Sequence, residues 1–138
     1  MTNIIQLENV YKTYRLGGRR KDSASVKALK EINLTIPTGD FIAIQGPSGS
    51  GKSTLLNIIG GIDVPTKGNV YIEGKDISKL SERELTKVRL YKIGFIFQLF
   101  YLIPTLTAEE NIELPMKEAK LSRDNGGVGR TSCSNLWG

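Results

Sequence analysis

The fold is decided by one stretch of sequence, Gly46-Pro47-Ser48-Gly49-Ser50-Gly51-Lys52-Ser53-Thr54. The stretch matches the Walker A pattern of phosphate-binding loops without a mismatch: Gly46 is followed by four residues and then by Gly51-Lys52-Ser53. An apolar run at residues 41–44 precedes the stretch, and a helical pattern at residues 55–59 follows it. Strand, glycine-rich turn and helix are the context that such a loop requires. The sequence therefore predicts a phosphate site, rather than a glycine-rich turn that binds nothing.

Each residue type in this stretch, the phosphate loop (residues 46–54), has a chemical reason. Gly46, Gly49 and Gly51 can take positive φ and carry no Cβ, so backbone N–H groups can point at a phosphate. The helix that follows adds free N–H groups and the positive end of its dipole. Lys52 can reach the β- and γ-phosphates, the Ser53 hydroxyl suits Mg²⁺, and the Thr54 hydroxyl supports the loop. The predicted ligand-binding residues here are Gly46, Ser48, Gly49, Ser50, Gly51, Lys52, Ser53 and Thr54.

Composition favours a soluble globular domain. The 138 residues are 39% hydrophobic and 24% charged, with a net charge of +5. The one cysteine, Cys133, gives no disulfide framework and fits a reducing cytosol. No signal-peptide core follows Met1, and the longest apolar region, residues 93–104, is too short to cross a bilayer. A basic cluster at residues 19–21 lacks interleaved aromatics, so we expect a solvated hairpin tip and no nucleic-acid partner.

Three strands are predicted before the helix. Residues 4–14 alternate apolar and polar side chains, as in a half-buried strand, and residues 28–36 form a second strand after a loop at 17–27. Residues 41–45 are apolar through Ile44, as in a strand buried on both faces of a parallel sheet. Such a strand would deliver the phosphate loop at its carboxyl end, where open α/β sheets bind ligands.

The rest of the chain predicts alternating helices and strands. The first helix runs from Lys52 to a glycine stop at residues 60–61, and a short strand covers residues 69–72. Capping boxes at residues 81–84 and 107–110 open helices to about Leu90 and Leu121, the second with Pro115 as a kink, and residues 93–97 form a strand between them. Residues 122–138 fit no period, and we expect them to be poorly ordered.

Several stretches together carry a family resemblance. They are residues 10–14 (VYKTY), 28–34 (ALKEINL), 55–61 (LLNIIGG), 65–68 (PTKG), 93–98 (IGFIFQ) and 111–115 (NIELP). In this order over residues 4–121 they resemble the amino-terminal half of an ABC transporter ATP-binding subunit, most closely the lipoprotein-release and macrolide-export branch. The resemblance implies an α/β, P-loop NTPase-like nucleotide-binding domain with an antiparallel β-subdomain at the N-terminus. The domain would be truncated, with residues 1–121 as its partial form and 122–138 as a disordered or non-native tail.

The resemblance also implies roles outside the phosphate loop. Tyr14 matches the aromatic that stacks on adenine, with Tyr11 as the fallback; a core aromatic is the alternative. Gln98 matches the Q-loop glutamine that reaches Mg²⁺ and the attacking water; a surface glutamine is the alternative. The apolar stretch from Gln98 to Pro104 would lie near a membrane-spanning subunit, unless it packs in the core. The resemblance implies ATP and Mg²⁺ as ligands. In the family the subunits form homodimers, and the implied location is the cytoplasmic face of the cell membrane.

The sequence departs from the family pattern in its second half. The signature Leu-Ser-Gly-Gly-Gln, a Walker B strand ending in Asp-Glu and the switch histidine do not occur. Phosphoryl transfer needs a residue that orients water and a second metal ligand, so we expect little or no hydrolysis by this chain alone. Loss of pattern at Ser122 suggests a truncated or frame-shifted product, and a short natural protein is the alternative. The runner-up function is a non-catalytic nucleotide-binding fragment or interaction module; a GTPase is disfavoured because no Asn-Lys-x-Asp occurs.

Overall fold

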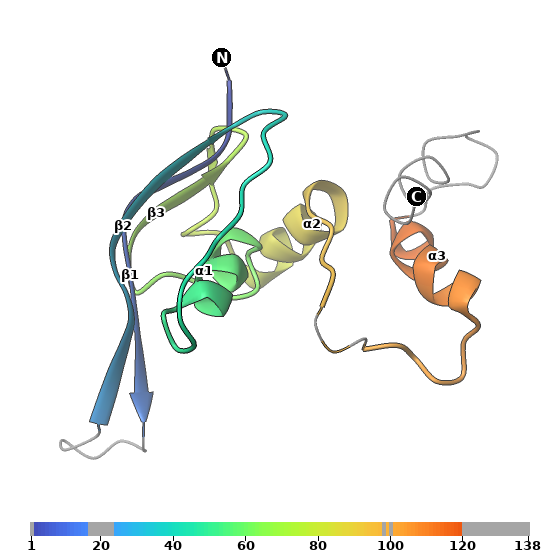
Figure 1. The fold of residues 1–138 in the computed structure, drawn as a ribbon. Coiled ribbons are helices and arrows are strands. Elements are labelled where there is room, and N and C mark those ends of the chain that lie inside the picture. Colours follow the sequence, from blue (N-terminus) through green and yellow to red (C-terminus); the bar gives the residue numbers. More distant parts are fainter. Residues whose placement is uncertain (1, 17–23, 98, 100, 120–138) are drawn as a thin grey trace. The chain divides into compact units, whose positions relative to one another are not determined.

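The computed structural model describes residues 2–16, 24–97, 99 and 101–119 of the chain (Figure 1). These residues belong to two compact units, residues 1–86 and residues 87–138. The first unit holds an antiparallel sheet and the phosphate loop, and the second holds most of the chain beyond it.

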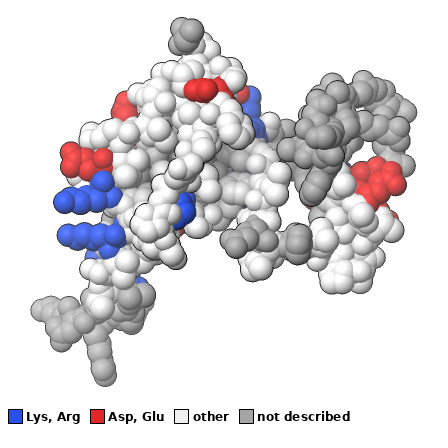
Figure 2. Space-filling view, in the orientation of Figure 1, with Lys and Arg blue, Asp and Glu red and all other residues white. Residues whose placement is uncertain are grey.

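The first unit is built on a four-stranded sheet. Its strands are β1 (Asn3–Leu16), β2 (Ala24–Pro37), β3 (Lys67–Ile72) and β4 (Lys75–Asp76), in the order β2-β1-β3-β4 and antiparallel throughout. The predicted antiparallel subdomain is therefore confirmed. Lys27 and Lys30 on the edge strand β2 are exposed, and Figure 2 shows basic side chains gathered on the β2 side of the sheet. Charges on an edge strand discourage pairing with another chain.

The two long strands extend beyond their predicted bounds. The sequence placed a loop at residues 17–27, but Ala24 to Lys27 belong to β2 and pair with the end of β1, where Tyr14 faces Val26. The error has a simple cause, because a hairpin arm gains main-chain hydrogen bonds even where its side chains show no apolar alternation. The longer arm carries Tyr14 within a paired strand rather than at a frayed end.

A bulge bends β1 in its middle. The register of β1 shifts against both neighbours between Leu7 and Tyr11, and Asn9 takes a φ of +48°. Gly68 on β3 approaches this point closely, because a Cβ there would lie 2.3 Å from the carbonyl oxygen of Asn9. With a φ of +88° as well, position 68 accepts only glycine.

The core lies between the sheet and the helix α1 (Lys52–Ile59). Leu7, Val10 and Val70 from the sheet and Ile58 from α1 are no more than 2% exposed. Ile77 and Leu85, which follow the sheet in sequence, are 3% exposed. Full burial of such side chains stabilises a fold by roughly 1.5–3 kcal/mol each. This burial fixes α1, and with it the loop that leads into it, against β2.

The strand predicted at residues 41–45 is wrong for this structure. These residues have no regular secondary structure, and Phe41 and Ile42 are 91% and 44% exposed. A buried strand forms only where neighbouring strands complete its hydrogen-bond ladder. Among the described residues, the ladders join only β1 with β2, β1 with β3 and β3 with β4, all antiparallel. The strand predicted at residues 93–97 is also wrong, for the same reason; no described strand pairs with it.

The helices that the capping boxes predicted are confirmed. In α2 (Glu82–Lys92), which spans the boundary between the units, the N–H of Ser81 donates to Glu84 Oε2 at 3.0 Å. In α3 (Ala108–Glu118), Thr107 is the N-cap and both bonds of its box with Glu110 are present. Pro115 lies inside α3, which ends at Glu118; Leu121 and the predicted disordered tail lie outside the described residues. Over the described ranges, every helix is too short or too polar to cross a membrane.

Candidate functional site

The phosphate loop has the backbone that its glycines predicted. Gly46, Gly49 and Gly51 have φ values of +156°, +78° and +90°. A turn closes the middle of the loop, where the N–H of Ser50 donates to the carbonyl of Pro47 at 3.3 Å. At Gly51 a Cβ would lie 2.5 Å from the carbonyl oxygen of Ala28, so the loop meets β2 at a position that only glycine can occupy.

The N-terminus of α1 is open. Gly51 is the N-cap in a left-handed conformation and supplies no side-chain cap. The first amides of a helix have no partner within it, and they carry the positive end of the dipole. Ser53, in the first turn, is exposed, and Thr54 beside it is half-buried. An uncapped helix that begins at an exposed glycine-rich loop offers several N–H donors to an anion.

The Lys52 side chain folds back over the loop. Its Nζ donates to the carbonyl oxygens of Gly46 at 2.8 Å and Pro47 at 2.7 Å, and lies 3.4 Å from Ser50 Oγ. The ammonium group thus lies against the turn of the loop. Loop, helix start and cation together form a compact donor set for a phosphorylated ligand.

Tyr14 belongs to a second cluster, which β1 shares with the loop after α1. Its hydroxyl donates to Asp63 Oδ2 at 2.8 Å, and 37% of the residue is exposed. Lys12 Nζ donates to Asp63 Oδ1 at 2.6 Å and to the Val64 carbonyl at 2.8 Å, and it lies 5.0 Å from the centroid of the Tyr14 ring. Lys12 and Asp63 were missed from the sequence, where 51 positions separate them; the only signal was an acidic residue just after a helix end.

The Asp63 carboxylate is stabilised in its charged form. Burial raises its pKa, but hydrogen bonds from Lys12, Tyr14 and the N–H of Val64, together with the Lys12 charge, outweigh burial and hold the pKa below its ordinary value. Lys12 is 9% exposed, so its ammonium depends on this carboxylate for a charged partner. The pair joins the strand that carries Tyr14 to the loop that follows α1.

The strand register links the two clusters. Gly51 approaches Ala28 and Leu29 of β2, and Leu29 pairs with Lys12 of β1. Tyr14 lies two residues further along β1, about 7 Å at the rise of a strand. The loop and the tyrosine therefore lie over neighbouring parts of one sheet.

The residues predicted around the Q-loop fall in the second unit and are only partly described. Gln98 and Phe100 lie outside the described residues. Around them, Leu99, Tyr101 and Leu102 are 67%, 71% and 61% exposed, and the Tyr101 ring packs edge-on against Phe97 at 5.1 Å. Core packing, the alternative for this stretch, is not seen in its described residues.

Metal ligands are sparse in the part of the chain that the structure describes. It holds no group of three or more His, Cys, Asp or Glu side chains that could bind a metal ion. Mg²⁺ keeps several waters and takes phosphate oxygens with one or two protein ligands, so one exposed hydroxyl, that of Ser53, fits a magnesium ion bound together with a phosphorylated ligand.

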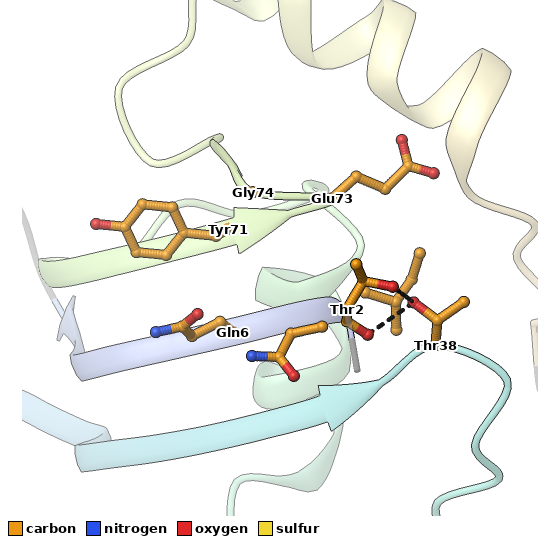
Figure 3. A pocket seen from close by; sticks show the side chains of 8 residues that line it. Thr2, Gln6, Thr38, Tyr71, Glu73 and Gly74 are labelled. Carbon is orange, nitrogen blue, oxygen red and sulfur yellow. Dashed lines mark hydrogen bonds between the residues drawn. The ribbon is translucent and has the colours of Figure 1, made fainter.

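A further hollow of about 540 Å³ lies elsewhere on the first unit (Figure 3). Thr2, Thr38, Tyr71 and Glu73 line it where three strands end, and Thr38 Oγ1 donates to the Thr2 carbonyl at 2.9 Å. It shares no lining residue with the phosphate loop or with the Tyr14 cluster. Its chemistry is mostly neutral and specifies no ligand.

Comparison with known proteins gives a consistent result. The family described as "ABC transporter" matches residues 29–135. The uncharacterized ABC transporter ATP-binding protein MJ0796 of Methanocaldococcus jannaschii is 55% identical over 113 residues, 82% of this chain and 46% of its own length. The lipoprotein-releasing system ATP-binding protein LolD 1 of Rhodopseudomonas palustris is 47% identical over 116 residues, 84% of this chain and 50% of its own.

A solved structure agrees with the sequence relatives. The dimeric structure of a post-hydrolysis state of the ATP-binding cassette MJ0796, bound to ADP and Pi, superposes with a TM-score of 0.79 at 50% identity, covering 92% of this chain and 53% of that one. The chain thus spans about half the length of these three relatives. By family match, sequence identity and fold, the chain belongs to the ABC transporter family, among its ATP-binding proteins.

Proposed function

We propose that this chain binds Mg-ATP at the phosphate loop, as the nucleotide-binding part of an ABC transporter ATP-binding subunit that works through a membrane partner in export or lipoprotein release. One observation carries the proposal. The uncapped start of α1 follows a loop with three glycines at positive φ, and the Lys52 ammonium lies on that loop. This combination is an anion site with a cation already in place.

Each residue has a part in binding. Backbone N–H groups of the loop and the first turn of α1 donate to the β- and γ-phosphates, and Lys52 neutralises part of their charge. Magnesium bound with ATP supplies further neutralisation, and the Ser53 hydroxyl is its proposed protein ligand, with Gln98 as the second. Tyr14 stacks on the adenine ring, which adds affinity of roughly 1–3 kcal/mol without reading the base by hydrogen bonds.

Hydrolysis is the family's activity, but this chain lacks parts of the machinery. The sequence contains neither a Walker B acid to orient water nor the signature motif. We therefore propose binding without steady turnover by the purified 138-residue chain. Phosphate release is measured with Lys52→Ala as the blank. Continuous release by the wild type would contradict this part of the proposal, and it would also exclude the alternative function, a non-catalytic fragment.

Calorimetric titration with ATP and Mg²⁺ tests the binding site. Lys52→Ala removes charge-assisted hydrogen bonds, so the Kd for ATP is expected to rise roughly ten- to a hundredfold. The matched control is Lys30→Ala, which removes an exposed lysine from edge strand β2. Equal Kd values for wild type and Lys52→Ala would show that ATP binds elsewhere or not at all.

A membrane-spanning subunit is the proposed partner of the stretch between Gln98 and Pro104. The described residues here include three apolar side chains that are more than half exposed: Leu99, Tyr101 and Leu102. Such a run is a candidate contact surface. We propose the cytoplasmic face of the cell membrane as the location of the chain when it is bound to such a partner. Replacing Tyr101 and Leu102 by serine should reduce co-purification with a coexpressed membrane subunit while leaving ATP binding unchanged.

A homodimer is the second assembly to test, because the solved relative MJ0796 is dimeric whereas this chain lacks the signature motif. Light scattering with and without Mg-ATP measures it directly. A chain that stays monomeric at high ATP would remove the dimer from the proposal and leave the binding site intact.

A further inference from the structure

In the cluster of Lys12, Tyr14 and Asp63, the two carboxylate oxygens of Asp63 bind two different side chains of β1. Asp63 uses one carboxylate oxygen for Lys12 Nζ, at 2.6 Å, and the other for the Tyr14 hydroxyl, at 2.8 Å. The loop after α1 therefore holds a side chain of β1 by its polar tip. An ion pair that served the fold alone would need only the first of these contacts.

Lys12 acts on the same ring from another direction. Its Nζ lies 5.0 Å from the ring centroid of Tyr14, within the range of a cation–π contact. An ammonium on one face of a ring leaves the opposite face for stacking, and Tyr14 is 37% exposed. The ring is thus restrained at its hydroxyl and on one face while part of its surface stays accessible.

Restraint before binding has an energetic consequence. A free tyrosine side chain loses rotamer freedom when a base stacks on it, and this loss of entropy lowers the affinity for the base. A ring that is already held avoids much of that cost. The contacts that hold it therefore add to the affinity for a base without touching the base.

We propose that Asp63 is a positioning residue for the nucleotide base: with Lys12 it holds the Tyr14 ring in the orientation in which adenine stacks. The proposal rests on the proposed function, because it takes Tyr14 as the adenine platform. The contacts of Asp63 thus add to the affinity for the base, whereas the phosphate loop, at the other end of α1, binds the phosphates. The lowered pKa of Asp63 keeps the carboxylate charged at neutral pH, as this role requires.

The test compares ATP with inorganic tripolyphosphate, which has the phosphates but no base. Tyr14→Phe keeps the ring and removes its bond to Asp63. The double variant Lys12→Met with Asp63→Leu removes both charges together, which avoids leaving a buried lysine unpaired. Each is expected to raise the Kd for ATP about three- to tenfold, the worth of a hydrogen bond, and to change that for tripolyphosphate less than about twofold.

Tyr71→Phe is the matched control. It removes a tyrosine hydroxyl that accepts a hydrogen bond from Asn69 at 3.1 Å on the same sheet, away from the cluster. Its Kd for both ligands should equal that of the wild type. Urea denaturation of every variant separates a change of ligand preference from a loss of fold.

Three outcomes overturn the proposal in distinguishable ways. If Tyr14→Ala loses the preference for ATP over tripolyphosphate but Tyr14→Phe and the double variant keep it, Asp63 does not position the ring, although Tyr14 still binds the base. If the variants weaken both ligands alike, the cluster is structural. If the wild type itself binds neither ligand, or Lys52→Ala binds as the wild type does, the proposed function fails first.

Discussion

Apolar segments of the first unit differ sharply in burial. Val10 in β1 and Val70 in β3 are fully buried in a paired sheet, whereas Phe41 and Ile42, equally apolar, are exposed and unpaired. The difference lies in their partners, because β1 has an antiparallel neighbour on each side within this chain, β2 on one and β3 on the other. A strand buried on both faces needs neighbours on each side, and the described residues supply none for residues 41–45. Hydrophobicity therefore marks a segment for burial but does not by itself bury it.

The largest test of this comparison places a charge in each segment. Val10→Asp puts an unpaired carboxylate into the core, and the free energy of unfolding of the first unit should fall by more than about 4 kcal/mol. Phe41→Asp changes a side chain that is already 91% exposed, and its effect should stay within about 0.5 kcal/mol. Urea denaturation followed by circular dichroism measures both. Comparable losses would mean that residues 41–45 are buried in solution.

Glycines at nearly equal backbone angles sharpen the same contrast. Gly68 in the sheet has φ +88° and Gly39, in the turn before Phe41, has φ +84°. A Cβ at position 68 meets backbone oxygens at 2.3 and 2.5 Å, while one at position 39 meets nothing within 4 Å. Gly39→Ala should cost about 1 kcal/mol of backbone strain, and Gly68→Ala about 3 kcal/mol or more because the bulge must move. Equal costs would show that the packing of β3 on the bulge is loose.

The tie between β1 and the loop after α1 should be sensitive to acid. The pKa of Asp63 is lower in the folded chain than its ordinary value, so its contribution to stability is complete above that ordinary value, about 3.9. The contribution is lost as the pH falls from there through the lowered pKa, because protonation then favours the unfolded chain. Asp63→Asn should therefore be less stable than wild type at pH 6 by roughly 2–3 kcal/mol, because it leaves the buried Lys12 without a charged partner, and the difference should shrink below pH 4. A constant gap from pH 6 to pH 3 would contradict this assignment.

The smallest effect is expected in the second unit. Thr107→Ala removes the side-chain acceptor of the N–H of Glu110 and opens the capping box of α3. The loss should be about 1 kcal/mol and confined to this helix. Hydrogen exchange of the amides in α3 should speed up, while those of β1 and β3 keep their rates. Faster exchange in the sheet amides as well would be inconsistent with a local cap.

Local signals in the sequence were reliable where the residues that form a feature are close together. The phosphate-loop glycines, the helix starts at Ser81 and Thr107 and the first two strands were predictable from the residues, because turn geometry, capping and apolar alternation act over short stretches. The antiparallel pairing of the strands was implied only by the family resemblance. The strand at residues 41–45 was not, because its pairing depends on partners outside the segment. The cluster around Asp63 was missed because nothing local relates Lys12 to a residue 51 positions later.

The position of Lys52 has a consequence for how a ligand is received. The Lys52 ammonium is already bonded to two carbonyl oxygens of the loop, so it is not a free donor that awaits a ligand. An arriving triphosphate exchanges these bonds for its own and does not simply add new ones. The heat released on binding should then be modest for so charged a ligand. The favourable free energy of binding should come instead from the release of water and ions. Raising the ionic strength should therefore raise the Kd for the triphosphate.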